Sequence, residues 1–278
     1  MSMKKLFTMV CVALMTLAAS AQSKVYVTRQ ITPAALVKIY KALGVKAEGR
    51  VAVKVSTGEG SNPNYLKPEL IKDLVYEVDG TIVENNTAYG GDPNDVRNNS
   101  ENHWRVIDRH GFTKYFPVDI MDEYDEIRIP VRDHTHLNYD IVGGHMANYD
   151  FMIALNHFKG HPMGGYGGAL KNLSIGCASQ NGKAYIHSAG KMNKLDARKL
   201  WTPEMIGDQD GFLESMAAAA GGHHLHIGDE QHVGRLRLCG PSRSREAQGL
   251  WHPGLHRPRG ARPGLCRHHQ PAEGHGRE

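Results

Sequence analysis

The sequence has few of the residues that build a disulfide framework or a cysteine-rich cluster. Its 278 residues include four cysteines, and between residues 22 and 220 there is one, Cys177. Small secreted scaffolds depend on an even set of spaced cysteines, so that class of protein is excluded. Long apolar runs are also lacking. The longest, Leu6–Ala18, is too short to span a bilayer as a mature helix.

The same apolar run has the features of an export signal. It follows Lys4 and Lys5 and precedes the small-residue site Ala19-Ser20-Ala21, a pattern typical of a secretory signal peptide. We expect residues 1–21 to be removed and the mature protein to be periplasmic or extracellular, with no membrane segment after signal removal. The alternative is a buried first helix.

Residues 221–278 lack lysine, phenylalanine, tyrosine and asparagine, yet they hold 9 arginines and 9 of the 17 histidines. No window in this tail repeats apolar residues with the period of a helix or a strand for long. Two origins fit an aberrant tail that does not belong to the preceding domain. It is a natural disordered segment, or it is the domain's end translated in a shifted reading frame, which would make this product non-functional. The DNA sequence of the gene near codon 220 distinguishes them.

The charge of the chain gives no support for a nucleic-acid partner. Residues 1–220 carry 24 basic and 24 acidic side chains, so the net charge of +4 comes entirely from the tail. A sequence pI of 8.8 therefore reflects the tail and not a basic surface on the domain. The sequence contains no indication of the oligomeric state.

Residues 22–220 predict one α/β domain. Strands are predicted at Val51–Val55, Thr81–Glu84, Val118–Met121, Ile127–Val131, Tyr139–Val142 and Phe151–Leu155. Helices are predicted to begin at Pro33 and Pro68, within Asp92–His110, and at Gly211. Strand, loop, helix and strand within Val51–Glu84 form a βαβ unit, which implies parallel strands. We expect a mostly parallel sheet with flanking helices in Rossmann-like layers, and a C-terminal part that is truncated or disordered.

A glycine-rich loop follows the strand predicted to be central. In open parallel sheets, ligands bind beyond the carboxyl ends of the strands. The loop ends in a predicted helix start near Ala169, where free backbone N–H groups favour an anion. The predicted ligand-binding residues are Gly164, Gly165, Gly167, Gly168, Lys171 and Asn172. A tight turn with closely packed backbone fits equally well. The spacing matches neither a Walker A motif nor a dinucleotide fingerprint.

Three residues near this loop are candidate metal ligands: His157, His161 and Cys177. The histidines are four apart, but Gly160 and Pro162 exclude the helical spacing that would place them on one face. A lone cysteine is most often a small buried residue, although a free thiol is unusual in an exported protein.

Several motifs resemble the family called domain of unknown function 362. The matching segments are Lys54–Glu59, Asn64–Leu70, Asn86–Gly91, Asn156–His161 and Gly165–Ser179. The resemblance covers roughly residues 48 to 220. It implies an α/β domain whose members are often iron–sulfur or metal-associated and whose activity is unassigned. This chain lacks the closely spaced cysteines that many members carry.

Two functional hypotheses follow for a correctly folded product. The first is a domain that binds a metal ion, an iron–sulfur cluster or a small-molecule anion at the glycine-rich loop. The second is an enzyme acting on a small polar or anionic metabolite, with Lys159 or Lys171 as an electrophilic or acid–base group. The sequence leaves open whether the protein is an enzyme.

Overall fold

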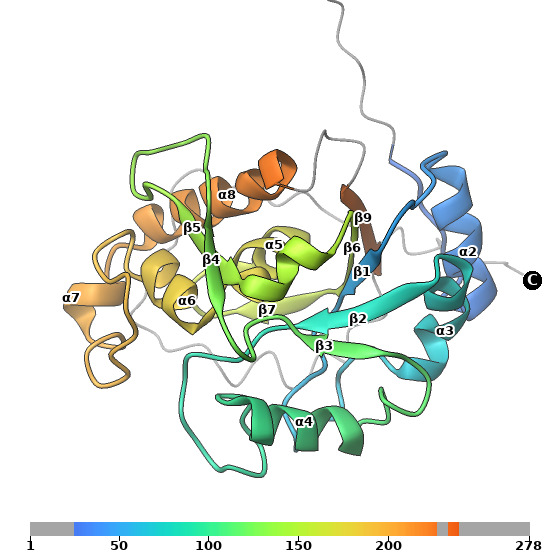
Figure 1. The fold of residues 1–278 in the computed structure, drawn as a ribbon, viewed down its shortest axis with the longest axis horizontal. Helices are drawn as coiled ribbons and strands as arrows, with labels where there is room; N and C mark the ends of the chain where they lie inside the picture. Colours follow the sequence, from blue (N-terminus) through green and yellow to red (C-terminus); the bar gives the residue numbers. More distant parts are fainter. Residues whose placement is uncertain (1–24, 227–232, 239–278) are drawn as a thin grey trace, which may run out of the picture. The chain divides into compact units, whose positions relative to one another are not determined.

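The computed structural model describes residues 25–226 and 233–238, which form a layered α/β arrangement (Figure 1). The predicted signal peptide and most of the predicted tail lie outside these residues, so export and the origin of the tail stay predictions. Within the described part of the chain, no helix has both the length and the apolar character needed to cross a membrane.

A five-stranded sheet forms the middle layer, and all of its neighbouring strands are parallel. The order is β3-β2-β1-β6-β9. The strands are β1 (Val51–Lys54), β2 (Gly80–Glu84), β3 (Val118–Ile120), β6 (Phe151–His157) and β9 (Val233–Leu238). The parallel α/β fold expected from the apolar runs is therefore confirmed. The chain passes outward from β1 to β2 and β3 and then returns to place β6 on the other side of β1.

Three helices cover one face of this sheet. They are α2 (Pro33–Ala42), α3 (Pro68–Glu77) and α4 (Ser100–Arg109). Alternate residues of the first strand, Val51 and Val53, pack into the same buried cluster as Leu36 of α2 and Ile71 of α3. This is the period of two that a strand imposes on its side chains. Both α2 and α3 begin where the proline signals predict, because proline at the first helical position forfeits only an N–H that has no helical partner.

Four helices lie on the other side. They are α5 (Ala169–Cys177), α6 (Gln180–His187), the short α7 (Pro203–Ile206) and α8 (Gln209–His226). Ala52, which alternates with the valines of β1, is buried in a cluster with Leu173 and Cys177 of α5. The last helix continues past the predicted boundary at residue 220, and β9 follows it beside β6. Regular structure therefore extends into the segment where no element was expected.

Two antiparallel strand pairs stand apart from the main sheet. They are β4 (Glu126–Ile129) with β5 (Asp140–Gly143), which leads into the 3-10 helix η1 (Gly144–Asn148), and β7 (Lys159–His161) with β8 (Gly165–Gly167). The strands predicted near residues 127 and 140 exist, but they pair with each other and not with the parallel sheet. The segment expected to be one loop, residues 156–168, instead contains the β7–β8 hairpin.

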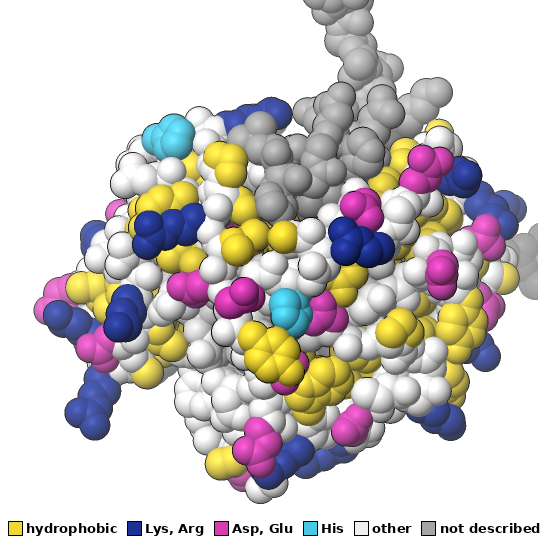
Figure 2. Space-filling model, in the orientation of Figure 1, with side chains coloured by type: hydrophobic (Ala, Val, Ile, Leu, Met, Phe, Trp, Pro, Cys, Tyr) yellow, Lys and Arg dark blue, Asp and Glu magenta, His cyan; other side chains and the backbone are white. Residues whose placement is uncertain are grey.

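Charged side chains are mixed over the face shown in Figure 2. Lysine and arginine side chains are interspersed there with aspartate and glutamate side chains, and no broad patch of one sign is visible on that face. The mixture agrees with the equal numbers of basic and acidic residues before residue 221.

Candidate anion-binding site

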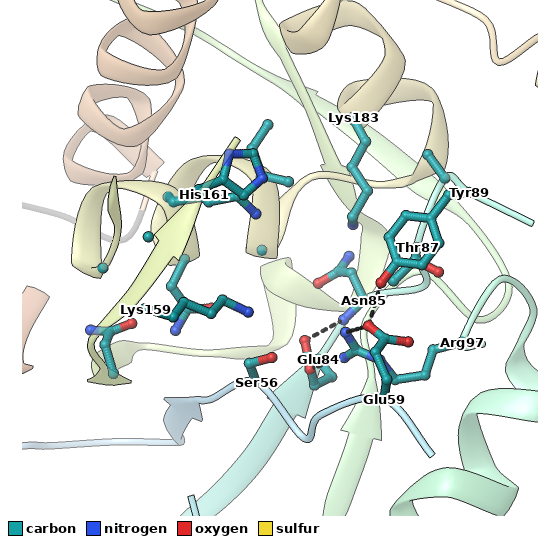
Figure 3. Close-up of a pocket in the computed structure, with 18 of the residues that line it drawn as sticks. Ser56, Glu59, Glu84, Asn85, Thr87, Tyr89, Arg97, Lys159, His161 and Lys183 are labelled. Atoms are coloured by element: carbon teal, nitrogen blue, oxygen red, sulfur yellow. Dashed lines mark hydrogen bonds and ion pairs between the residues drawn. The ribbon is translucent and has the colours of Figure 1, made fainter. Parts of the chain in front are cut away.

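A cavity of about 260 Å³ lies at the carboxyl ends of β1, β2 and β6 (Figure 3). Its lining includes Ser56 and Glu59 after β1, Glu84 and Asn85 at the end of β2, and Asn156 of β6. The chain reverses its direction across the sheet between β1 and β6. Connections leave such a switch point toward opposite sides and open a crevice, where open α/β sheets bind their ligands.

One group of charges beside this cavity is joined by ion pairs, and we call it the paired cluster: Lys54, Glu59, Glu84 and Arg97. The Lys54 ammonium donates to Glu84 Oε2 at 2.7 Å, and the Arg97 guanidinium donates to Glu84 Oε1 and, at 3.0 Å, to Glu59 Oε1. The backbone N–H of Thr57 adds a third donor to Glu84 at 2.9 Å. Lys54 and Glu84 are almost completely buried, at 0% and 3% exposed.

The paired cluster keeps its charges because each partner compensates the other's burial. Burial alone would raise the pKa of Glu84, but Lys54 and then Arg97 outweigh it and hold that pKa well below its usual range. Burial likewise disfavours charged Arg97, yet Glu84 and Glu59 raise its pKa. Removing one member would leave a buried charge without a partner, which is far costlier than the pair itself.

A second group, the lysine group, consists of Lys159 of β7, Lys171 of α5 and Lys183 of α6. All three line the cavity, and within the described residues none forms an ion pair with a carboxylate. The Lys183 ammonium donates to the carbonyl oxygen of Ala178, whereas Lys159 and Lys171 make no hydrogen bond with the described residues.

The pKa values of the lysine group are lowered. Burial, and then the neighbouring charges of Lys159 and Lys183, lower the pKa of Lys171 to about 7. Burial, partly offset by Asp122, lowers the pKa of Lys183 to about 8. Loss of hydration and then Arg97 lower the pKa of Lys159. In each case the largest cause is burial, and nearby carboxylates offset only part of it for Lys159 and Lys183.

Uncharged polar atoms in the cavity wall also lack partners. Among the described residues, neither amide atom of Asn85 nor the hydroxyl of Thr87 has a hydrogen-bond partner, and Asn85 is 1% exposed. Buried polar atoms are normally hydrogen-bonded, so an unused amide facing a cavity marks a position for a ligand or for water. Figure 3 shows Asn85 between Lys183 and Glu84.

The chain matches the family model described as Domain of unknown function (DUF362) over residues 51–248, which is most of its length. The chain belongs to the DUF362 family. The matched segment begins with the first residue of β1 and contains every residue that lines the cavity. No curated protein matches the chain. Since the DUF362 description assigns no activity, function has to be argued from the cavity.

The structure divides the residues predicted to bind an anion in this DUF362 chain. Four of them line the cavity: Gly167, Gly168, Lys171 and Asn172. Gly168 is the N-cap of α5 and has no side chain to cap the helix, so the first N–H groups of α5 have no capping side chain. The amide of Asn172 is engaged with Lys54, accepting from its ammonium and donating to its carbonyl oxygen, both at 3.1 Å.

The two other predicted glycines are outside the cavity lining: Gly164 lies in the turn of the β7–β8 hairpin, and Gly165 begins β8. Gly165 has a φ of +61°, which favours glycine. In the hairpin, Gly167 lies opposite Lys159, and a Cβ there would come within 3.2 Å of that side chain. The glycine-rich loop is therefore a tight turn at its tip and a cavity wall at its base. Anion binding by these residues stays a prediction.

The three candidate metal ligands are not assembled into a metal site within the described part of the chain. His157 and His161 line the cavity, but Cys177 does not. Its thiol is fully buried against Met152 Sδ at 3.9 Å, and burial raises its pKa to about 12, which disfavours the thiolate that metals need. Among the described residues no three His, Cys, Asp or Glu side chains are grouped to hold a metal ion. These residues do not fit an iron–sulfur cluster.

Sequence reasoning missed several residues of the site. Lys183 and His187 come from α6, a helix that was not predicted and that has no motif to connect it with the sheet edge. Glu84 and Asn85 lie at the end of the strand predicted at Thr81–Glu84, but no sequence pattern singled them out. The sequence signal that could have identified them is the carboxylate of Glu84 at the end of an apolar strand. A carboxylate at such a position is buried only when a partner such as Lys54 neutralises it.

Proposed function

We propose that this protein binds a small organic anion, a carboxylate or a phosphate ester, in the cavity at the carboxyl ends of β1, β2 and β6. The observation that carries the proposal is the lysine group, three amines in one cavity with no carboxylate partner among the described residues. Bringing like charges together in a partly buried space is unfavourable, and a bound anion would remove that cost.

The remainder of the wall suits a specific ligand. Glu84 is shared between Lys54 and Arg97, and it forms no ion pair with the lysine group. Asn85 offers a donor and an acceptor, and Thr87 offers a hydroxyl, for the uncharged part of the ligand. A cavity of about 260 Å³ is slightly smaller than most ligand pockets, which are roughly 300–1,000 Å³. The size favours a small metabolite over a dinucleotide.

A metal or iron–sulfur site has less support than the anion site. The candidate metal ligands His157, His161 and Cys177 are not grouped into a metal site among the described residues, while the cationic groups line one cavity. An enzymatic activity on the bound anion is compatible with the same cavity, and it depends on the chemistry of individual lysines.

Calorimetric titration of the full-length chain with malonate tests the proposal. The control ligand is malonamide, which has the same skeleton without charge. We expect malonate to bind and malonamide not to bind. Because an anion raises the pKa of Lys171 and Lys183, binding at pH 8 should take up protons, which is measured by repeating the titration in buffers of different ionisation enthalpy.

Two substitutions localise the binding. Lys171→Met removes a charge-assisted hydrogen bond worth about 1.5–3 kcal/mol, so malonate should bind roughly 10- to 100-fold more weakly. Lys38→Met, on the exposed side of α2, is the matched control and should leave the affinity unchanged. Equal binding of malonate and malonamide, or equal losses in both variants, would contradict an anion site in this cavity.

A further inference from the structure

One amine of the lysine group, that of Lys171, has the environment of a nucleophile. It lies in the first turn of α5, close to Gly168, and it lines the cavity. Within the described residues it donates no hydrogen bond and forms no ion pair, whereas the buried Lys54 ammonium donates three hydrogen bonds. An amine attacks a carbonyl carbon through its lone pair, so it must be uncharged and free of such partners.

The surroundings of Lys171 favour the uncharged amine. Burial comes first, and the charges of Lys159 and Lys183 add to it, so that its pKa is about 7. About half of the molecules then hold a neutral amine at pH 7, against fewer than about one in a thousand for an ordinary lysine. Desolvation together with neighbouring cations is a recognised way to activate a lysine for covalent chemistry.

Two uncharged imidazoles complete the surroundings. Both line the cavity, and the pKa of each is lowered first by burial, to about 3 for His161 and about 4 for His187. His161 Nδ1 accepts from the backbone N–H of Gly164 at 3.0 Å, so its Nε2 carries the proton and can donate. His187 Nδ1 donates to the carbonyl oxygen of Lys183 at 2.7 Å, which leaves its Nε2 as an acceptor.

These features together define a ligand with two groups. We propose that Lys171 forms an imine with the carbonyl carbon of a small 2-oxo acid held in this cavity, an inference that rests on the proposed anion binding. Lys159 and Lys183 hold the carboxylate. A neutral N–H such as that of His161 polarises the carbonyl oxygen, as neutral histidines do elsewhere, and Asn85 supplies a further donor at the cavity wall.

The covalent step balances without any other reactant. The Lys171 nitrogen attacks the carbonyl carbon, and the carbon–oxygen double bond becomes a single bond in a carbinolamine. A proton moves from that nitrogen to the oxygen by way of His187 Nε2. The second proton of the nitrogen follows to the oxygen, the carbon–oxygen bond breaks, water leaves, and the nitrogen and carbon form a double bond. No electrons are gained or lost overall.

Reductive trapping tests this inference. The full-length chain is incubated with pyruvate and cyanoborohydride, which reduces an imine to a stable secondary amine, and the modified lysine is mapped by mass spectrometry of peptides. We expect one adduct, on Lys171, formed at a rate that saturates with pyruvate concentration. Lactate, which has the carboxylate but no carbonyl, should give no adduct and should slow the reaction with pyruvate.

Variants and binding data separate the inference from the proposed function. Lys171→Arg, checked for a native thermal transition, should give no adduct, and Lys38→Arg should give the same adduct as the parent chain. Mapping in the parent chain settles the site even where a variant fails to fold. If lactate and pyruvate both bind but no adduct forms, the imine is overturned and the anion site stands. If neither binds, the anion site fails too. Labelling of Lys38 and other exposed lysines at equal rates would also overturn the inference.

Discussion

The paired cluster and the lysine group lie beside one cavity but differ in how their charges are compensated. In the paired cluster, Glu84 lies between Lys54 and Arg97 and receives donors on both carboxylate oxygens. In the lysine group, the described residues supply no carboxylate within ion-pairing distance of Lys159, Lys171 or Lys183. Among the described residues, every charge of the first arrangement has an ion-pair partner, and no charge of the second has one.

The pKa values show the same contrast. The pKa of Glu84 is lowered, so this carboxyl stays charged despite its burial. The pKa of Lys171 is lowered to about 7, which favours the neutral amine, because no carboxylate opposes the effect of burial. Charges that compensate one another stabilise a fold, and charges that do not are typical of sites where a ligand or a reaction uses them. Substitutions in the two groups should therefore act on stability with opposite signs.

The largest effect is expected from Glu84→Gln. It leaves the buried ammonium of Lys54 and the guanidinium of Arg97 without their shared anion, which costs about 3–5 kcal/mol in the free energy of unfolding. Urea denaturation of the full-length chain measures it. Glu48→Gln is the control, because Glu48 forms only an exposed surface pair with Lys46 and should change stability by less than about 1 kcal/mol. A Glu84→Gln variant as stable as the parent would show that the cluster does not hold this edge of the sheet.

A smaller loss is expected when the space around the paired cluster is filled. A Cβ on Gly176 would come 2.5 Å from Asn172 Oδ1 and 3.2 Å from the Lys54 ammonium nitrogen. Gly176→Ala should therefore destabilise the protein by about 1–3 kcal/mol, the usual cost of overpacking. Gly160→Ala is the matched control, since a Cβ at Gly160 meets no atom within 4 Å. Equal melting temperatures for the two variants would argue that Asn172 is free to move away from Lys54.

The contrast also explains what the sequence could predict. The helices α2 and α3 and the strands β1, β2 and β6 follow from local signals, a proline at a helix start or a run of apolar residues, which act within a few positions. The contacts of the paired cluster are not local. Lys54 meets Glu84 after 30 positions and Asn172 after 118, and no pattern in one sequence reports such a pair.

The β7–β8 hairpin shows the same limit at short range. Its glycines suggested an anion loop, because glycine serves both to turn a chain and to bring backbone close to a ligand. Only the pairing of Lys159 with Gly167 across the hairpin distinguishes the two uses. Lys171 was identified as a cationic residue, but the lowering of its pKa depends on Lys159 and Lys183, which three different elements bring together.

The smallest and most diagnostic effect is a gain in stability from Lys171→Met in the absence of ligand. An unfolded chain binds a proton at this lysine up to its ordinary pKa of about 10.4, whereas the folded protein releases it near pH 7. Below pH 7 the folded state carries the whole cost of the buried charge. Between pH 7 and about 10.4 the folded amine is neutral while the unfolded chain still binds the proton. The cost therefore falls as the pH rises toward the pKa of the unfolded chain.

The variant should therefore be more stable than the parent by on the order of 1–2 kcal/mol at pH 6, and the difference should shrink steadily toward pH 10. Urea denaturation at several pH values measures it, with Lys38→Met expected to show no such trend. A difference that is constant with pH, or that grows as pH rises, would mean that Lys171 is charged and compensated in the folded protein. Lys171 would then resemble the members of the paired cluster, and the lysine group would no longer contain an uncompensated Lys171.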